Sequence, residues 1–400
     1  MEIYDVIHGN IKIDEIAKKI IDTEEFQRLR SIKQLGCCNY IFPSAVHTRF
    51  EHSIGVYYLA NKYIDILNTD GQFTENDRKC ITIGALIHDL GHGPYSHLFD
   101  EIVSEEKNHE YRSIEMLKHM NTKYSFGLTE EDISKINIII YPEDTYIKND
   151  KKFVYQIVSN KNGIDVDRFD YIVRDIKMTG LNYGIEYERI MNNSYINDGE
   201  IVYSEKVKTS IEEFFRIRFI MYKEVYNHHT VRSIEYMMKE YIQGIDKILN
   251  INETIQNNNW DDFMKLNDSI IDVIYFINKD TLDNLTIVDL NYGKDGTVSI
   301  IDGLKELIQK IRTRNIYKSV GEIITDSVIH LEGYNRENII IDTVRLSLNG
   351  EETCKYVKAR ESVNKSLTIQ GNDKYVTCIY YKKDEYKDEA IQLFEKLKKL

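Results

Sequence analysis

Three histidines and two aspartates fall within thirteen residues of this chain, in the segment HDLGHGPYSHLFD. They are His88, Asp89, His92, His97 and Asp100. Imidazole nitrogens and carboxylate oxygens are ligands for divalent metal ions, and histidine is the side chain that transfers protons near neutral pH. A hydrophobic core has no use for such a group. The spacing therefore indicates a metal and proton-transfer site, unless it arose by chance.

The distribution of histidines along the chain argues against chance. Seven of the eleven histidines lie within one window of 73 residues, where uniform scatter would place about two. They are His47, His52, His88, His92, His97, His109 and His119. A single histidine beside an apolar helix face is usually structural, but clustering of this degree is a signal of a functional site.

Helices are the elements that would have to position these side chains. An apolar lead-in over residues 81–87 predicts a helix that ends at the His88–Asp89 pair, where glycines and a proline over residues 91–94 stop it. Residues 74–77 are typical of an N-cap with an acidic third position. A helix end followed by such a loop would hold imidazoles and a carboxylate together in one cavity.

Two further predicted helices carry polar stripes. Arg49 and His52 are three residues apart and therefore share a helix face. Asp167, Tyr171 and Asp175 follow at intervals of four and form a single stripe, whose aromatic member distinguishes it from an ordinary solvated face. These two helices are expected over residues 48–67 and 165–175. Further helices are expected over residues 11–35, 111–120, 133–140, 153–159 and 210–247.

The pattern changes after about residue 250. Alternating segments over residues 338–348 and 374–382 predict strands, and residues 387–400 predict a closing amphipathic helix. Only three prolines occur, so long helices are permitted almost everywhere. The expected fold is mainly α, with an all-helical domain over residues 1–250 and a smaller mixed α+β C-terminal lobe over residues 251–400.

Composition excludes several classes of function. The formal net charge of −13 argues against nucleic acid as the main ligand. Five cysteines, an odd number without CxxC spacing, predict reduced thiols rather than a disulfide or zinc framework. The N-terminus does not resemble a signal peptide, and no apolar run approaches the roughly 20 residues of a membrane helix. We expect an intracellular, cytoplasmic protein with no membrane partner.

Two imidazoles and two carboxylates on predicted helices form a candidate ligand set for a divalent metal ion. They belong to His52, His88, Asp89 and Asp167. This borderline-to-hard set suits Mg, Mn, Fe or Zn, and also Co or Ni, but not a metal that prefers thiolates. Four protein ligands on an octahedral ion leave positions open for water and for a phosphate oxygen.

The other histidines suit an anionic substrate beside that metal. His92, His97 and His109 can bind phosphate oxygens or protonate a leaving oxygen, and Asp100 and Glu110 are near enough in sequence to orient them. Arginines at positions 49, 168 and 218 can hold a polyphosphate through charge-assisted hydrogen bonds. Together these residues describe metal-dependent hydrolysis of a phosphorylated substrate.

Longer strings carry a resemblance to a known family. The pattern H…HD…D is the broad signature of the HD-domain phosphohydrolases. Four strings are sharper: DVIHGNIKIDEIAKKIIDTEEFQRLRSIKQLG, IFPSAVHTRFEHSIGVYYLA, HDLGHGPYSHLFD and NGIDVDRFDYIVRD. They resemble the deoxynucleoside triphosphate (dNTP) triphosphohydrolases, in particular the catalytic core of the animal enzymes that combine a SAM and an HD domain. The resemblance runs from about residue 2 to 322, where IRTRNIYKSVGE matches the C-terminal lobe, so no SAM domain is expected.

The resemblance implies a reaction and its catalytic residues. The family releases inorganic triphosphate and a deoxynucleoside, so attack is at the α-phosphorus. The matching metal ligands are His52, His88, Asp89 and Asp167. The matching catalytic residues are His92, His97, Asp100, His109 and Glu110. We assign His97, as a hypothesis, the role of general acid toward the 5′-oxygen.

The resemblance also implies a substrate pocket. Phosphate contacts match Arg49, Arg168 and Arg218, although the animal enzymes have lysine at the second of these positions. The sugar pocket matches Gln34, Leu35, Tyr171 and Asp175, and the base end matches Tyr226 and Asn227. An apolar side chain and an aromatic ring packed at the 2′ position would leave no room for a ribose hydroxyl, which predicts a preference for dNTPs over NTPs.

Regulation by nucleotides is the weaker part of the match. In the animal enzymes, nucleotides bound between subunits assemble an active tetramer. The matching activator residues are Asp22, Gln27, Arg30, Phe42, Arg189, Lys206, Arg314 and Lys318. Three basic partners are replaced, by Met1, Ser204 and His229. We expect activation by GTP or dNTPs at reduced affinity, in a homodimer or homotetramer, with residues 251–400 as the regulatory and oligomerisation lobe.

Two other functions compete with this interpretation. One is an HD-type phosphodiesterase, or a nucleotidase that acts on another nucleotide. The other is a non-catalytic scaffold that binds nucleotides. The arginines and the sugar-pocket stripe favour a triphosphate substrate, and the presence of all metal and histidine positions favours catalysis.

Overall fold

The computed structural model describes residues 1–103, 105–142, 151–160, 163–276, 293–328, 334, 336–346, 353–357, 364–368 and 374–399 of the 400-residue chain. The chain begins with an antiparallel hairpin of β1 (Glu2–Asp5) and β2 (Gly9–Lys12), in which Ile3 pairs with Ile11. Short helical segments follow: α1 (Glu15–Ile21), α2 (Glu24–Gln27), and the 3-10 helices η1 (Arg28–Ser31) and η2 (Gly36–Tyr40). The prediction of helix over residues 11–35 is therefore right for most of that range but wrong at its start and end.

Three long helices form the centre of the helical part: α3 (Arg49–Leu67), α4 (Glu75–Ile87) and α7 (Glu130–Ile140). The N-cap predicted at residues 74–77 is confirmed, and a second cap of the same kind starts α7. Thr74 and Thr129 each accept a hydrogen bond from the backbone of the third helical residue, whose aspartate accepts from the cap in return. Helix α4 packs between the other two.

The two capping boxes also hold α4 and α7 together. Lys79 of α4 lies 2.8 Å from Asp132, the acidic capping residue of α7. Lys135 of α7 pairs with Asp77, the acidic capping residue of α4. Each aspartate thus satisfies backbone donors of its own helix and a cation of its neighbour, so the pair joins the N-terminal ends of α4 and α7, opposite the end of α4 that carries His88.

Further helices of various lengths continue the domain. They are α5 (His97–Asp100), η3 (Glu105–Lys107), α6 (His109–Tyr124), α8 (Lys152–Tyr155), α9 (Val166–Thr179) and α10 (Tyr187–Met191). The predicted helices at 111–120 and 165–175 are confirmed, and that at 153–159 is shorter than expected.

The tract over residues 210–247 is helical as predicted, but it is interrupted at Asn227 and His228. The structure has η5 (Glu205–Val207), α11 (Lys208–Met221), the π-helix η6 (Tyr222–Tyr226) and α12 (His229–Leu249). No proline or glycine marks the break, because a π turn needs neither residue. The break places Tyr226 and Asn227 at the central pocket.

The C-terminal part mixes helices with strands. The helices are α13 (Ile251–Gln256), α14 (Trp260–Phe263), α15 (Ile270–Val273), α17 (Gly293–Arg312), η7 (Asp384–Tyr386) and α18 (Lys387–Leu397). An antiparallel sheet has the order β5 (Lys318–Thr325), β9 (Lys374–Tyr381), β6 (Ile339–Leu346). A second sheet has the order β3 (Ser194–Asn197), β4 (Glu200–Ser204), β7 (Thr353–Val357), β8 (Asn364–Thr368).

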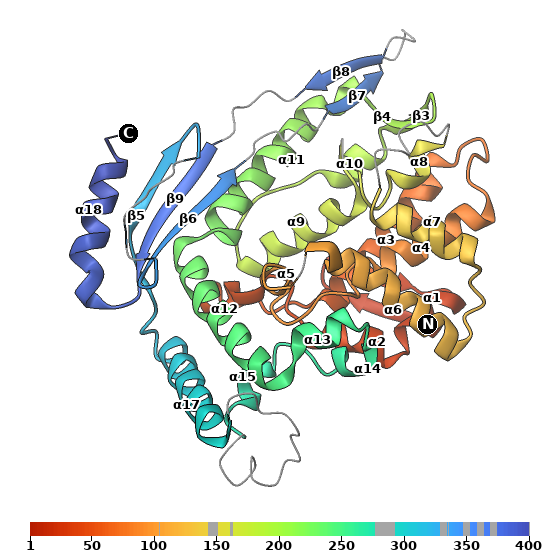
Figure 1. The fold of residues 1–400 in the computed structure, drawn as a ribbon. Coiled ribbons are helices and arrows are strands. Elements are labelled where there is room, and N and C mark those ends of the chain that lie inside the picture. Colours follow the sequence, from red (N-terminus) through yellow and green to blue (C-terminus); the bar gives the residue numbers. More distant parts are fainter. Residues whose placement is uncertain are drawn as a thin grey trace.

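The helical part and the C-terminal part differ in how their hydrophobic side chains are packed. One large core extends from the N-terminal hairpin through α17, and a small separate cluster lies between the β5–β9–β6 sheet and α18. Helix α12 lies between the helical part and that sheet (Figure 1). The expected fold class, mainly α with a smaller strand-containing C-terminal part, is confirmed. The boundary near residue 250 stays a prediction. None of the described helices combines the length and the apolarity that crossing a bilayer requires.

Candidate active site

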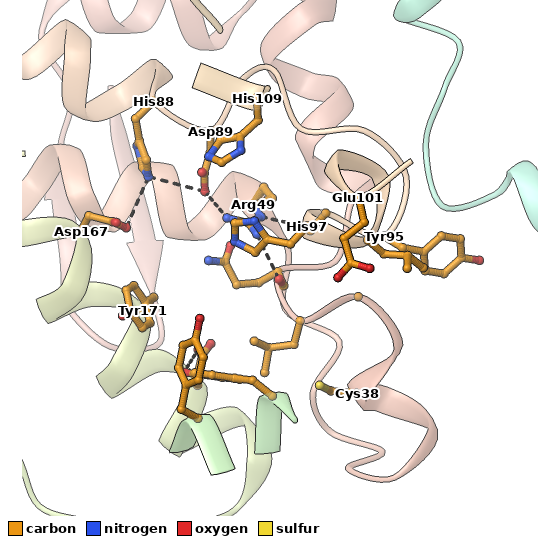
Figure 2. A pocket seen from close by; sticks show the side chains of 18 of the residues that line it. Cys38, Arg49, His88, Asp89, Tyr95, His97, Glu101, His109, Asp167 and Tyr171 are labelled. Atoms are coloured by element: carbon orange, nitrogen blue, oxygen red, sulfur yellow. Dashed lines mark hydrogen bonds and ion pairs between the residues drawn. The ribbon is translucent and has the colours of Figure 1, made fainter. Parts of the chain in front are cut away.

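A pocket of about 410 Å³ opens where the start of α3, the end of α4, α5, the start of α6, and α9 meet. Most residues that the sequence assigned to chemistry or to substrate line it. In Figure 2, dashed lines join His88 to Asp167 and to Asp89, and Asp89 to Arg49. Segments far apart in sequence are therefore joined at one site.

The four candidate metal ligands converge on one point. His52 Nε2 lies 3.0 Å from Asp167 Oδ1 and 3.2 Å from His88 Nε2. It lies 3.4 Å from Asp89 Oδ2, and His88 Nε2 lies 3.5 Å from each of the two carboxylates. Side chains from α3, α9 and the end of α4 thus present two nitrogens and two oxygens to one another.

The outer nitrogens of both rings fix which nitrogen faces the centre. His88 Nδ1 lies 2.8 Å from the carbonyl oxygen of Ala85, and His52 Nδ1 lies 2.8 Å from Asp170 Oδ2. A carbonyl or carboxylate oxygen only accepts, so in the neutral rings Nδ1 carries the hydrogen and Nε2 carries the lone pair. Two lone pairs 3.2 Å apart repel unless a proton or a metal ion lies between them. The donor set therefore fits a divalent metal.

The electrostatics of this centre favour positive charge. Burial lowers the pKa of His52, but hydrogen bonds to Asp167 and Asp170 outweigh it and raise that pKa to about 10. Burial raises the pKa of Asp89, yet the charge of Arg49 holds it well below its usual range. The carboxylates attract a proton and a metal ion alike. A proton and a metal ion therefore compete for the Nε2 atom of His52.

Arg49 serves the metal ligands as well as the pocket. Its guanidinium donates to Asp89 Oδ2 at 2.7 Å, to Ser96 Oγ at 3.0 Å and to the carbonyl of Gln34 at 3.3 Å. It lines the pocket although the residue is only 3% exposed. The expected phosphate contact is placed beside the candidate metal site, and the same side chain holds a ligand carboxylate.

A second group of imidazoles lies next to the first. His109 Nδ1 is 2.8 Å from Asp100 Oδ2, and the rings of His92 and His109 stack with centroids 3.9 Å apart. The lone pairs of stacked rings lie in parallel planes and cannot converge on one ion. His109 Nε2 lies 3.4 Å from Glu110. This arrangement suits proton transfer and anion binding better than a second metal.

The histidines of this second group differ in access. His92 is fully buried; its Nε2 lies 3.3 Å from Asp89 Oδ1, and its Nδ1 has no hydrogen-bond partner among the described residues. Burial, with the charges of Arg49 and His109, lowers its pKa far below the usual value, so the ring is neutral. The His97 side chain is 71% exposed and lines the pocket. His109 also lines the pocket but is only 16% exposed, so His97 is the member most open to a bound molecule.

The other end of the pocket holds the sugar and base candidates. Its lining includes Gln34, Leu35, Tyr171, Asp175, Arg218, Tyr226 and Asn227. Asp175 accepts from Tyr226 Oη at 2.6 Å and pairs with His47 Nε2 at 2.7 Å. Arg218 donates to Tyr171 Oη at 3.3 Å. Gln34 Oε1 is buried without a hydrogen-bond partner in the described part of the chain, so it can accept from a ligand hydroxyl.

Arg168 is the expected substrate residue that does not line this pocket. Its guanidinium donates to the carbonyls of Asn160, at 2.9 Å, and Gly163, and it pairs with Asp165, the N-cap of α9. The side chain bends back over the turn before its helix because the cap aspartate is three residues away. In this conformation Arg168 stabilises the start of α9.

The candidate activator residues lie outside the central pocket, in several places. Arg30 donates to Gln27 Oε1 at 2.8 Å and stacks on Phe50, and Asp22 is the C-cap residue of α1. Arg189 donates to the carbonyl of Lys206. The rest are Phe42, against His228; Arg314, which donates to the carbonyl of Tyr40; and Lys318, paired with Asp384. One chain does not bring these groups together, and their role stays a prediction.

Two positions that sequence reasoning left without a role support the site. His47 pairs with Asp175, and Asp170 bonds the outer nitrogen of His52. Asp170 precedes Arg174 by four residues, which is the spacing of an ion pair on one helix face. This spacing could have indicated from the sequence that Asp170 is paired. His47 lay inside the histidine window but has no local spacing that indicates its partner.

The helical fold and the H…HD…D ligand set define an HD-domain protein, and comparison with known families agrees. The HD domain matches residues 49–174, and the HD associated region matches residues 185–275. The chain belongs to the HD-domain family.

Individual relatives are more specific. An HD domain-containing protein of Acanthamoeba polyphaga mimivirus is 38% identical over 343 residues, which cover 79% of this chain and 72% of that protein. The Dictyostelium discoideum homolog of deoxynucleoside triphosphate triphosphohydrolase SAMHD1 is 35% identical over 81% of this chain and 61% of its own length. Homo sapiens deoxynucleoside triphosphate triphosphohydrolase SAMHD1 is 31% identical over 84% of this chain and 57% of its own length. The chain thus spans about three fifths of these two relatives.

Proposed function

We propose that this protein is a metal-dependent dNTP triphosphohydrolase, which cleaves a dNTP to the deoxynucleoside and inorganic triphosphate. One observation carries the proposal. A single pocket is lined by three of the four metal donors, His88, Asp89 and Asp167, with His52 buried behind them, and the stripe of Asp167, Tyr171 and Asp175 runs along its wall. The names of the SAMHD1 relatives support the same reaction.

The residues around the metal donors suit cleavage at the α-phosphorus. A divalent cation held by them would polarise a phosphoryl oxygen and lower the pKa of a water molecule. Arg49 and Arg218 line the pocket and bring positive charge to the triphosphate. His97 is the most exposed imidazole of the pocket and donates its proton to the departing 5′-oxygen. Asp100 Oδ2 lies 3.7 Å from His97 Nδ1 and orients the ring.

The sugar end gives the preference for deoxyribose a physical basis. Leu35 and Tyr171 supply an apolar side chain and a ring where a 2′-hydroxyl would lie. The unpartnered Gln34 Oε1 accepts a hydrogen bond from the 3′-hydroxyl. Binding of the sugar then satisfies a buried acceptor whose isolation costs about 1–3 kcal/mol.

Product analysis tests this function. The metal-depleted protein is incubated with each dNTP and each NTP, with Mn²⁺ or Mg²⁺, and the products are separated by ion-exchange chromatography. We expect inorganic triphosphate from dNTPs only, and none from the His88→Ala and Asp89→Ala variants. Release of pyrophosphate or orthophosphate would instead favour an HD-type phosphodiesterase or nucleotidase. Tight dNTP binding without any product would favour a non-catalytic scaffold.

Activation by GTP or dNTPs in a dimer or tetramer is the second part of the proposal. The candidate activator residues lie outside the pocket, and a site shared between subunits would bring them together. Because Met1, Ser204 and His229 lack the expected cations, we expect weak activation. If neither the mass on size-exclusion chromatography nor the turnover changes with added GTP, this part fails. The cysteines whose side chains the structure describes are buried free thiols, which supports an intracellular, cytoplasmic location.

A further inference from the structure

The candidate metal ligand His52 is held from behind by a buried network. His52 Nδ1 lies 2.8 Å from Asp170 Oδ2, and the other oxygen of that carboxylate lies 2.7 Å from His8 Nε2. The side chains of His52 and Asp170 are fully buried, and that of His8 is 1% exposed. One carboxylate therefore joins the metal site to a histidine that is 162 residues away in sequence.

Arg174 completes the network and joins it to the N-terminal hairpin. It donates to both oxygens of Asp170, at 2.8 and 2.9 Å, and to Asp5 Oδ2 at 2.8 Å. Such a bidentate pair fixes the plane of the Asp170 carboxylate. Asp5 Oδ1 accepts from the backbone of Ile7 and His8, so it also shapes the turn that delivers the His8 ring.

The space for this network depends on a glycine in α3. Gly55 lies three residues after His52, on the same face of the helix. A Cβ atom at Gly55 would lie 1.9 Å from Asp170 Oδ1 and 2.5 Å from Arg174 Nη2. Any side chain here would displace the carboxylate, so the helix that carries the ligand also makes room for its support.

We propose that Asp170 and His8 are positioning residues of the metal site, so that the hairpin over residues 2–12 is a structural part of it. The proposal rests on the metal role of His52 given above. A carboxylate that only accepts holds the hydrogen on Nδ1 and leaves the Nε2 lone pair free for the metal. His8 and Arg174 keep that carboxylate from turning away.

Direct metal titration of the full chain tests the proposal. Protein stripped with EDTA is titrated with Mn²⁺, and free Mn²⁺ is followed by its electron paramagnetic resonance signal. Asp170→Asn should weaken binding on the order of 10- to 100-fold, because an amide can also donate to Nδ1 and so place the hydrogen on Nε2. His8→Ala should weaken it about 10-fold, and His8→Gln, which can still donate to Asp170, should recover most of the loss.

His47→Ala provides a matched control. His47 and Asp175 form an equally short buried pair, at 2.7 Å, but neither contacts a metal donor. Their loss should leave the Mn²⁺ affinity unchanged. Circular dichroism at the titration temperature selects the folded variants. If Asp170→Asn does not fold, His8→Ala and His8→Gln decide the question.

Two failures can be told apart. If wild type and His88→Ala bind Mn²⁺ equally, or neither binds it, the metal role of His52 and His88 is wrong. If wild type binds, His88→Ala does not, and folded Asp170→Asn and His8→Ala bind like wild type, only the positioning role is refuted. Equal losses in His8→Ala, His8→Gln and His47→Ala would also refute it, since that pattern indicates general destabilisation.

Discussion

Gly91 lies in the segment between α4 and α5, and its substitution tests how this segment packs against α6. A Cβ atom at this position would lie 2.3 Å from the carbonyl oxygen of His109, 2.5 Å from the backbone nitrogen of Ser113 and 2.7 Å from Arg112 Cβ. Gly91 also donates to Ser113 Oγ and accepts from Arg112 Nε. Gly91→Ala therefore presses on the first turn of α6, the turn that carries His109.

The structure sets the size of this effect. Two of the three contacts are with backbone atoms, which cannot move alone, so the start of α6 must shift by about 1 Å to restore van der Waals separation. Overpacking of this kind costs about 3 kcal/mol. A misplacement of about 1 Å near a reacting group lowers the rate on the order of 100-fold. We expect a lower urea midpoint and a fall in kcat.

Gly303→Ala is the matched control. Gly303 lies within α17, and no atom lies within 4 Å of the position that its Cβ would take. Alanine there should stabilise the protein by about 0.5–1 kcal/mol, because glycine is a poor helix former. The two substitutions add the same methyl group, so their difference isolates the packing at Gly91. Equal midpoints and equal kcat values in both variants would refute the account.

Three further predictions follow from the site and its supports. Stripping the protein with EDTA should lower Tm, and Mn²⁺ at 100 times its Kd should restore about 2.7 kcal/mol of stability by linkage; an unchanged Tm would contradict the metal site. Gln34→Met should raise KM for dNTPs yet stabilise the free protein by about 1 kcal/mol, since it removes an unpartnered buried oxygen; kinetics and thermal melts measure both. Burial raises the pKa of Asp77, but bonds to Lys135 and Thr74 outweigh it and lower that pKa to about 2, so the stability that this carboxylate contributes above about pH 4 is lost as pH falls toward 2. Melts of Asp77→Asn should then depend less on pH in this window than wild type does.

The helices were predictable where their signals are local. The caps at Thr74 and Thr129 lie within four residues of the groups they bond, so the sequence specifies these helix starts without knowledge of the fold. The alternation that predicted strands 338–348 and 374–382 is local as well, and β6 and β9 confirm it. The break between α11 and α12 was missed because tertiary packing, rather than a glycine or proline, sets it.

The candidate site was predictable in its ligand types but not in its supports. His52, His88 and Asp167 carry a pattern typical of HD domains, and the structure brings them together. The contact between His8 and Asp170 could not be predicted, because the two residues are 162 positions apart in sequence and only the tertiary fold brings them together. Arg168 was expected at the phosphates but bonds its own helix cap, a local competitor that the spacing to Asp165 made visible.

Two of the buried arginines bear on how far the folding of this chain would depend on a metal ion. Arg49 pairs with the candidate ligand Asp89, and Arg174 pairs with Asp170 behind the candidate ligand His52. These internal cations compensate carboxylates that would otherwise be buried as uncompensated charges before a metal arrives. Small zinc domains fold only with their ion, because the metal is their main source of stability. This chain has other sources of stability, its large core and the arginines, so its fold would not have to depend on an ion.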